Sequence, residues 1–534
     1  MGSFSDFALA AVNDGAFLLC VGFLGYVLLI VVPFVRRQEA EPGDARAFAW
    51  HFVVPCLDEA AVVGRTVRSL AVRFPTAHVW CVDDGSTDGT GAILAGLAAR
   101  CSRIHIVTRR PPEARQGKGA ALNAAWRAIS AWLPPETSRS HVILGVVDAD
   151  GRLDPRCLDV TAGPSFFGDA AVGAVQVQVR VVDRARGAGR SRTARLLMRL
   201  QDMEFSGVIA AIQTFRRHLG SVGMGGNGQF TRLSVLDRIA REHGTPWHGA
   251  LLEDFELGVH VLLAGHRTEY CHDTWVAQDG LPTLRSLVRQ RSRWAQGSMQ
   301  CFRYLWPVLR SPQIANAGAV EIAYFLLLPW LQLLGGLMYL ACTVVLVWFA
   351  LTLPSGPAGW FGAGGWGVLP LFVLFGLGPL LVWGPVYRST TARGLSRTKA
   401  VFLGLAGWPY SYVHHAATWW ALVRVARARH DWKKTEREVP GRPVLVPAAV
   451  PAVGLAPPTS VPLPYALTPA PVAPPAPEPV PAAPVQPAEV DWLGVVAYCP
   501  PQRHPRPPDP DDPALEAVLT LLAGPDRPLQ LEDV

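Results

Sequence analysis

Apolar residues form a continuous segment close to the start of the chain. It runs from about Ala16 to Phe34 and is followed directly by Arg36 and Arg37. Roughly 20 apolar residues are enough to cross the hydrocarbon core of a bilayer, and basic residues favour the cytoplasmic side. No small-residue cleavage site follows, which argues against a cleaved signal peptide. We therefore predict a retained transmembrane anchor at 1–37, with the following chain in the cytoplasm.

Apolar segments return in the second half of the chain. They cover residues 319–353, 367–386 and 401–422. The first is too long for one ordinary span at about 1.5 Å per residue and contains Pro329, which favours a hairpin or an interfacial helix followed by a span. Basic residues are frequent after the last segment. The pattern predicts transmembrane helices within 319–425, a basic juxtamembrane segment at 426–437 and a multi-pass protein of the cell membrane.

Between these apolar segments, hydrophobic residues no longer form long continuous runs. Short runs rich in Val and Ile alternate with stretches of helical periodicity, which is typical of βαβ units. We predict an α/β domain at 48–310 with a largely parallel sheet, ending in an amphipathic helix from Thr283 to Leu309 that lies on the membrane surface. The predicted strands are 51–55, 78–84, 104–109, 141–150 and 171–182.

The last part of the chain, 438–534, is rich in proline and alanine. Such a composition buries too little apolar surface to offset the entropy lost on ordering, so we predict a disordered tail. Apolar spacing at 514–522 predicts a short amphipathic helix in this tail, either solvated and transient or bound to a partner protein.

Composition supports a membrane protein. Hydrophobic residues make up 50% of the 534 residues, and the mean hydropathy is +0.22, which is high for a soluble chain. The net charge of +7 does not indicate a nucleic-acid partner, because the basic residues gather beside the apolar segments. Nine cysteines occur without a CxxC pair, as expected for reduced, buried thiols in a cytoplasmic domain.

Acidic residues follow several of the predicted strands. Asp83 and Asp84 end the second strand, while Asp148 and Asp150 flank one residue at the end of a later strand. Ligands of open α/β sheets bind beyond the carboxyl ends of the strands, so these carboxylates are expected to meet in one crevice. Asp148 and Asp150 suit a hard divalent cation, and Asp83 and Asp84 can accept from a nucleobase or ribose hydroxyl. A turn or a solvated loop is the alternative for Asp148 and Asp150, and an Asx-turn with a helix cap is the alternative for Asp83 and Asp84.

Further candidates lie outside the strand ends. Lys118 follows a glycine and can reach a phosphate as a point charge, with a solvated loop lysine as the equal alternative. Glu253 and Asp254 open a helix-like stretch, where a carboxylate would act as a general base or would stabilise the helix dipole. His260 belongs to no evident metal-binding motif and is expected to be structural or interfacial.

A cluster at 290–294 combines Gln290, Arg293 and Trp294 just before the chain becomes strongly apolar. An arginine suits phosphate oxygens, and an aromatic plate suits a sugar ring. Because the cluster also follows a candidate base and adjoins a membrane segment, it predicts an enzyme that transfers sugars at a bilayer surface.

Together these motifs resemble glycosyltransferase family 2, the membrane-bound inverting synthases that include cellulose, chitin and hyaluronan synthases and bacterial glycolipid synthases. The resemblance covers roughly 50–437 and implies a GT-A-type (Rossmann-like) α/β glycosyltransferase domain with multiple transmembrane helices. The motifs that carry it, in the family's order, are VPCLDE, DDGS, GKGAALN, DAD, GGNGQFTR, LEDFELG and QRSRW.

The resemblance also implies roles for the donor-site residues. Asp83 and Asp84 would contact the uridine of a UDP-sugar, and Lys118 would join them in nucleotide binding. Asp148 and Asp150 would hold Mg²⁺ or Mn²⁺ together with the diphosphate. In the first strand motif an aspartate, at position 58, replaces the family's usual asparagine, so the resemblance is weaker at that turn.

The remaining roles concern the transfer step. Asp254, beside Glu253, would deprotonate the acceptor hydroxyl. Gln290 and Arg293 would complete the donor site, with Arg293 toward the diphosphate, and Trp294 would lie under the acceptor. A single displacement of UDP would convert an α-linked donor into a β-linked product.

The acceptor has two predicted classes. Extension of a polysaccharide from UDP-hexose or UDP-N-acetylhexosamine is the first prediction, favoured by the spacing of Gln290, Arg293 and Trp294. Transfer of one sugar to a lipid such as diacylglycerol is the alternative, favoured by the runs 225–230 and 328–332, which are similar to glycolipid synthases. An inactive membrane scaffold with a partner-binding tail is the alternative of another class, and the gathering of mutually repelling carboxylates argues against it.

Overall fold

The computed structural model describes residues 2–183, 190–352 and 377–427, together with 358 and 374. The predicted tail at 438–534, most of the basic segment at 426–437 and part of the apolar segment at 367–386 lie outside the described residues.

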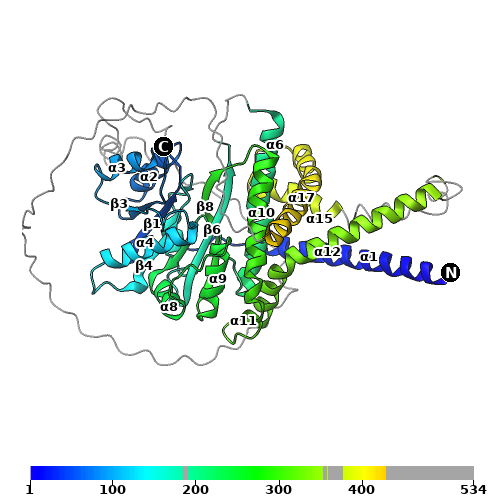
Figure 1. Cartoon of the computed structure of the whole chain (residues 1–534), viewed down its shortest axis with the longest axis horizontal. Coiled ribbons are helices and arrows are strands. Elements are labelled where there is room, and N and C mark those ends of the chain that lie inside the picture. Colours follow the sequence, from blue (N-terminus) through cyan, green and yellow to red (C-terminus); the bar gives the residue numbers. More distant parts are fainter. Residues whose placement is uncertain (1, 184–189, 353–357, 359–373, 375–376, 428–534) are drawn as a thin grey trace, which may run out of the picture. The chain divides into compact units, whose positions relative to one another are not determined.

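The α/β domain is built on one mixed sheet of eight strands within this described part of the chain (Figure 1). Their order is β3-β2-β1-β4-β7-β6-β8-β5. Neighbours from β3 to β4 are parallel, as are β6 and β8, whereas β7 runs antiparallel to both β4 and β6 and β5 runs antiparallel to β8. The strands are β1 (Ala49–Cys56), β2 (His78–Asp83), β3 (Ile104–Thr108), β4 (Val142–Val146), β5 (Arg152–Leu153), β6 (Val172–Val182), β7 (Gln229–Arg232) and β8 (Arg267–Asp279).

The α/β class and the five predicted strands are confirmed. The sheet is largely parallel as predicted, with four parallel pairings, but it also contains three antiparallel pairings that were not expected. The antiparallel strand β7 separates the parallel group β3-β2-β1-β4 from the parallel pair β6 and β8. It is only four residues long, too short to give a periodic signal in the sequence.

Alternation along β1 explains why both faces of the sheet are covered. Trp50, Phe52 and Val54 point to one face, while Val53 points to the other, because successive side chains of a strand alternate. Each face is closed by apolar sides of helices. These helices are α2 (Val63–Arg73), α3 (Thr90–Ala98) and α5 (Cys157–Thr161) on the first face, and α4 (Lys118–Trp132), α8 (Leu233–His243) and α9 (Glu253–Leu263) on the second.

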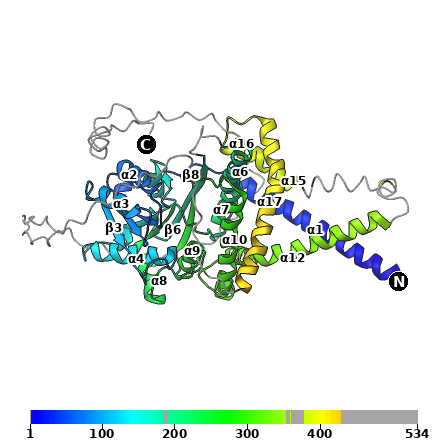
Figure 2. The ribbon, with the colours of Figure 1, turned by 45° about the horizontal axis from the view of Figure 1, so that its top comes forward.

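A second group of helices lies beside the sheet. The predicted amphipathic helix is present as α10 (Leu284–Cys301), which starts at Thr283, whose hydroxyl accepts the amide of Ser286. It packs along α17 (Arg397–Ala426) (Figures 1 and 2). The others are α1 (Gly2–Val35), α6 (Arg192–Met203), the π-helical turn η3 (Glu204–Ile209), α7 (Ala210–Leu219), the 3-10 turn η4 (Phe302–Tyr304), α11 (Leu305–Leu309), α12 (Asn316–Thr352), α15 (Gly378–Leu381) and α16 (Trp383–Thr390).

The long apolar segment after residue 316 is one helix. Helix α12 continues through Pro329 to Thr352, so the predicted alternatives of a hairpin and of an interfacial helix separate from a span do not occur here. Among the described residues, Asn316–Leu337 is long and apolar enough to cross a membrane, and Val21–Val35 is a shorter apolar helix. Figures 1 and 2 show α1 and α12 leaving the α/β domain on the same side. A multi-pass topology stays a prediction.

Candidate active site

A cavity of about 770 Å³ lies beyond the carboxyl ends of β1, β2 and β4. Because these strands are parallel and in register, with Cys56 opposite Asp83, their ends meet at one edge of the sheet. The cavity is lined by nine of the ten predicted site residues: Asp84, Lys118, Asp148, Asp150, Glu253, Asp254, Gln290, Arg293 and Trp294.

The two aspartates at the end of β2 have different surroundings. Asp84 lines the cavity and is paired with the Arg109 guanidinium, and both side chains are buried. Burial raises the pKa of Asp84, against the opposing effect of Arg109. Asp83 lies behind the lining, and its carboxylate accepts the amide of Ser86 at 3.0 Å. Asp83 therefore shapes the turn that presents Asp84.

The turn after β1 is fixed to the turn after β2. Asp58 has a φ of 53°, a left-handed conformation that asparagine and aspartate adopt more readily than most residues. Its carboxylate accepts the amide of Thr87 at 2.7 Å, and its own amide donates to the Ser86 hydroxyl at 3.0 Å. Aspartate thus fits this turn although the family resemblance favours asparagine.

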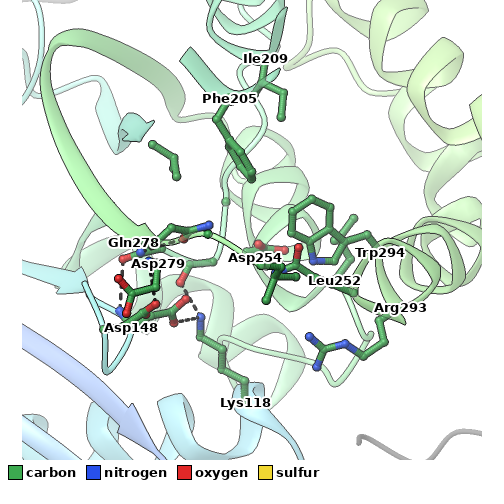
Figure 3. Close-up of a pocket in the computed structure, with 18 of the residues that line it drawn as sticks. Lys118, Asp148, Phe205, Ile209, Leu252, Asp254, Gln278, Asp279, Arg293 and Trp294 are labelled. Carbon is green, nitrogen blue, oxygen red and sulfur yellow. Dashed lines mark hydrogen bonds and ion pairs between the residues drawn. The ribbon is translucent and has the colours of Figure 1, made fainter. Parts of the chain in front are cut away.

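Lys118 and Asp148 form an ion pair inside the cavity (Figure 3). The Lys118 Nζ donates to Asp148 Oδ1 at 2.6 Å and to the carbonyl of Gly226. Burial lowers the pKa of Lys118, but Asp148 and the nearby Glu253 and Asp254 outweigh it, so the pKa is raised and the lysine stays charged. Gly226 leaves room for this pair, because a Cβ there would lie 3.0 Å from Nζ and 3.1 Å from Asp254 Oδ2 and would push these side chains by a few tenths of an ångström.

Asp150 shares its end of the cavity with an acidic residue that the sequence analysis missed. Asp279 ends β8 and lines the cavity, and its amide donates to Asp150 Oδ2 at 3.0 Å. The available signal was an acidic residue directly after the apolar part of a strand, as for Asp148. It was overlooked because β8 itself was not predicted.

The donor set at Asp148 and Asp150 fits a hard divalent cation. Carboxylate oxygens are the ligands that Mg²⁺ and Mn²⁺ prefer. Mg²⁺ is commonly held by one or two carboxylates together with substrate phosphates, and both Asp148 and Asp150 line this cavity. Lys118 acts as the counter-charge of Asp148 in the structure.

Glu253 and Asp254 form the first turn of α9 at the edge of the cavity. Burial and the neighbouring Asp254 raise the pKa of Glu253 to about 8, against the opposing charge of Lys118. Burial also raises the pKa of Asp254, again opposed by Lys118. Both carboxylates therefore hold a proton more readily than ordinary carboxylates do, which suits proton transfer.

Helix α10 contributes Gln290, Arg293 and Trp294 to the cavity. A residue between them, treated as a spacer in the sequence analysis, has a structural task. The Arg291 guanidinium lies 4.0 Å from the centre of the Trp294 ring and forms a buried ion pair of 2.6 Å with Glu204. Arg291 thus connects the tryptophan to the π-helical turn η3.

The cavity has an apolar end as well as an acidic one. Phe205 and Ile209 of η3 lie across from the carboxylates in Figure 3. The cavity lining continues to Phe325 and Leu328 of α12 and to Tyr26 of α1. The acidic strand ends and the apolar residues of α1, η3 and α12 therefore border the same space.

Comparison with known proteins identifies the family. A model of the glycosyltransferase like family 2 matches residues 49–297. An N-acetylglucosaminyltransferase of Rhizobium meliloti is 35% identical over 326 residues, which are 58% of this chain and 70% of that protein. The chain belongs to glycosyltransferase family 2.

Other similar proteins are named for other sugars. A beta-monoglucosyldiacylglycerol synthase of Synechocystis sp. is 28% identical over 305 residues, covering 55% of this chain and 58% of that protein. The chain thus spans less than two thirds of the length of this relative. The solved structure of the mannosyltransferase PcManGT from Pyrobaculum calidifontis, in complex with GDP-Man and Mn²⁺, has a TM-score of 0.48 and 19% identity, covering 79% of this chain and 98% of that chain.

Proposed function

We propose that this protein is a membrane-bound inverting β-glycosyltransferase that moves a hexose or an N-acetylhexosamine from a UDP-sugar to a lipid acceptor. The single observation that carries the proposal is the cavity that borders both the acidic strand ends and the apolar residues of α1, η3 and α12. The 48–310 domain would be the catalytic part and would face the cytoplasm.

The acidic end would bind the donor. Asp84 would accept from the uridine, with Asp83 supporting its turn. Asp148 and Asp150 would hold Mg²⁺ or Mn²⁺, which supplies electrostatic stabilisation for the departing diphosphate. Lys118 would move from Asp148 to phosphate oxygens when the ion binds, since it lies 2.6 Å from that carboxylate and carries the same sign of charge as the ion.

The other face of the cavity would complete donor binding and carry out proton transfer. Gln290 and Arg293 would hold the diphosphate from α10. Asp254 would take the proton of the acceptor hydroxyl as its oxygen attacks the anomeric carbon and the bond to UDP breaks, and Glu253 would adjust the pKa of this base. Attack from the face opposite UDP gives the inverted, β-linked product.

The acceptor would approach from the membrane side. The side chains of Phe205, Ile209 and Leu328 offer apolar contacts suited to acyl chains, and Trp294 suits the group that receives the sugar. Large apolar residues of α12 are exposed along its length, including Val320, Leu331, Leu334 and Leu337. Exposed apolar surface of this kind favours contact with lipid.

Extension of a polysaccharide is the second candidate. It is favoured by the spacing of Gln290, Arg293 and Trp294, which all line the cavity. The two candidates share the donor chemistry and differ in whether the product is soluble in organic solvent.

The test is incubation of membranes that contain the protein with a panel of radiolabelled UDP-sugars and Mg²⁺ or Mn²⁺, followed by organic extraction. Label in the lipid phase supports the proposal, whereas label in a water-soluble or insoluble polymer supports the second candidate. Asp254→Asn should lower kcat/KM by about 10²–10⁴-fold, the usual contribution of a general base. Glu242→Gln, at an exposed carboxylate of α8, is the matched control. Equal UDP release by the Asp254 variant and the control would refute the base assignment.

A further inference from the structure

A second cluster of metal-ligating side chains lies outside the cavity lining. His248, Glu256 and His260 each place one ligand atom so that all three atoms lie within 4.8 Å of one another. Glu256 and His260 are four residues apart on α9 and so share one face of the helix. His248 comes from the loop before α9. His260 showed no metal-binding motif in the sequence, because the third member of the cluster, His248, lies in a loop outside α9.

The carboxylate of the cluster is fully buried and is held by several donors. Glu256 is 0% exposed and accepts the Ala250 amide at 3.1 Å and the Tyr304 hydroxyl at 2.7 Å. The Arg303 guanidinium is its ionic partner, and that side chain is 56% exposed. A buried carboxylate needs a cationic partner. The Arg303 guanidinium can leave Glu256 and turn to solvent, because its side chain is already more than half exposed.

The histidines are prepared for a metal in two ways. Both ring nitrogens of His248 are buried, and neither makes a hydrogen bond within ordinary distance and angle limits among the described residues; the ring has only a looser contact with the Thr245 backbone. Buried polar atoms are normally better satisfied. The Tyr304 hydroxyl donates its proton to Glu256 and therefore accepts from the Nε2 of His260 at 3.1 Å, which leaves the Nδ1 of His260 as the nitrogen for a metal. Tyr304 therefore orients two of the three side chains, as hydrogen-bonded neighbours of metal ligands commonly do.

The protonation states agree with this geometry. Burial lowers the pKa of His260 to about 3 and also lowers the pKa of His248, where Glu256 opposes the shift. Both imidazoles are thus neutral at neutral pH, which is the form that binds a metal.

We propose that His248, Glu256 and His260 form a Zn²⁺ site, in which the ion replaces Arg303 as the cationic partner of Glu256. Two imidazoles and one carboxylate are a common ligand set for zinc and leave one position for water. Bonds of about 2.1 Å in tetrahedral geometry hold ligand atoms roughly 3.4 Å apart, so the cluster has to contract by about 1 Å or a little more. The site is separate from the Mg²⁺ or Mn²⁺ position proposed at Asp148 and Asp150.

The experiment is calorimetric titration of the purified full chain with ZnCl₂ in excess Mg²⁺, which occupies oxygen sites but competes poorly for imidazoles. We expect one Zn²⁺ per chain. His248→Gln and His260→Gln should each weaken binding at least tenfold, since even losing an outer partner of a ligand costs about 10–100-fold. Arg303→Gln should tighten binding several-fold because it removes the competing cation, and misfolding does not produce a gain in affinity.

The matched control is His243→Gln. The His243 ring lies 4.6 Å from the His260 ring and 5.3 Å from the His248 ring, yet His243 is outside the ligand group, so this variant should bind Zn²⁺ within about twofold of the parent. Absence of zinc binding in the parent would overturn the proposal. Unchanged affinity in both ligand variants, an Arg303 variant that binds no tighter, or an equal loss in the His243 variant would each overturn the assignment.

Discussion

Replacing Arg291 by methionine tests whether the buried ion pair with Glu204 holds Trp294 in the cavity. The Arg291 side chain is 2% exposed and that of Glu204 is 11% exposed, and the pair is 2.6 Å long. Breaking a buried pair by removing one partner typically costs about 3–5 kcal/mol, because the other charge stays buried. Glu204 keeps the Tyr410 hydroxyl at 2.5 Å and lies 3.5 Å from His414, so the lower value, about 3 kcal/mol, is expected for Arg291→Met.

The double variant separates the charge interaction from side-chain packing. Glu204→Gln alone leaves Arg291 buried without its carboxylate and should also cost about 3 kcal/mol. Glu204→Gln with Arg291→Met removes both charges and should cost no more than about 2 kcal/mol. The summed cost of the two single substitutions, about 6 kcal/mol, then exceeds the cost of the double substitution by at least about 4 kcal/mol. This coupling lies above the roughly 0.5–3 kcal/mol usual for residues in direct contact, as expected for a buried charge left without its partner.

The assay is unfolding of the purified proteins in detergent, followed by circular dichroism, with UDP release measured on the same samples. At about 2–4 °C per kcal/mol for domains of 150–250 residues, each single variant should lose at least about 6 °C in apparent Tm. Loss of the cation–π contact should raise the acceptor KM by up to about tenfold, with the KM for the UDP-sugar unchanged. If the losses of unfolding free energy in the two single variants sum to that of the double variant within about 0.5 kcal/mol, the coupling between Arg291 and Glu204 is refuted. An unchanged acceptor KM would refute the link between Arg291 and Trp294.

The remaining predictions concern the two ends of the cavity. Asp150→Asn should lower kcat/KM about a hundredfold through loss of roughly 3 kcal/mol of metal-based charge stabilisation, and retained stimulation by Mn²⁺ would contradict the metal role. Because the pKa of Asp254 is raised by burial and lowered by Lys118, the acid limb of kcat/KM should lie above the ordinary aspartate range. Lys118→Met should move that limb to higher pH, since it removes the charge that favours the ionised base, and a shift to lower pH would contradict this sign. Ile209→Glu should raise the lipid acceptor KM at least tenfold at an unchanged UDP-sugar KM, and a rise in both would place Ile209 outside the acceptor path.

The first half of the fold was predictable because most of its strands are buried on both faces, and the partly buried edge strand β3 still carries a run of Ile and Val. Continuous apolar runs identified β1, β2, β3, β4 and β6 within a few residues of their observed ends. The last strands were missed for a physical reason. β8 contains Glu, His and Asp residues, and its pairing with β6 changes register between Val177 and Gln178, which breaks the period of two that identifies a strand.

The donor end of the site was predictable because topology alone brings strand ends together. Asp84, Asp148 and Asp150 follow from that rule. Asp279 and Arg291 did not, because their importance depends on partners more than 80 residues away, Asp150 and Glu204. His248 likewise joins Glu256 only through the path of a loop.

The acceptor end illustrates why motifs identify the chemistry better than the product. The QRSRW motif lies wholly on α10, but the surface that an acceptor would contact is completed by η3, α1 and α12. Gln296 of α10 accepts from Arg424 of α17 at 2.7 Å, so the orientation of α10 also depends on the helix farthest along the described chain. Two family members can therefore share every residue of the motif and still present different acceptor surfaces, because that surface depends on how the membrane-side helices pack.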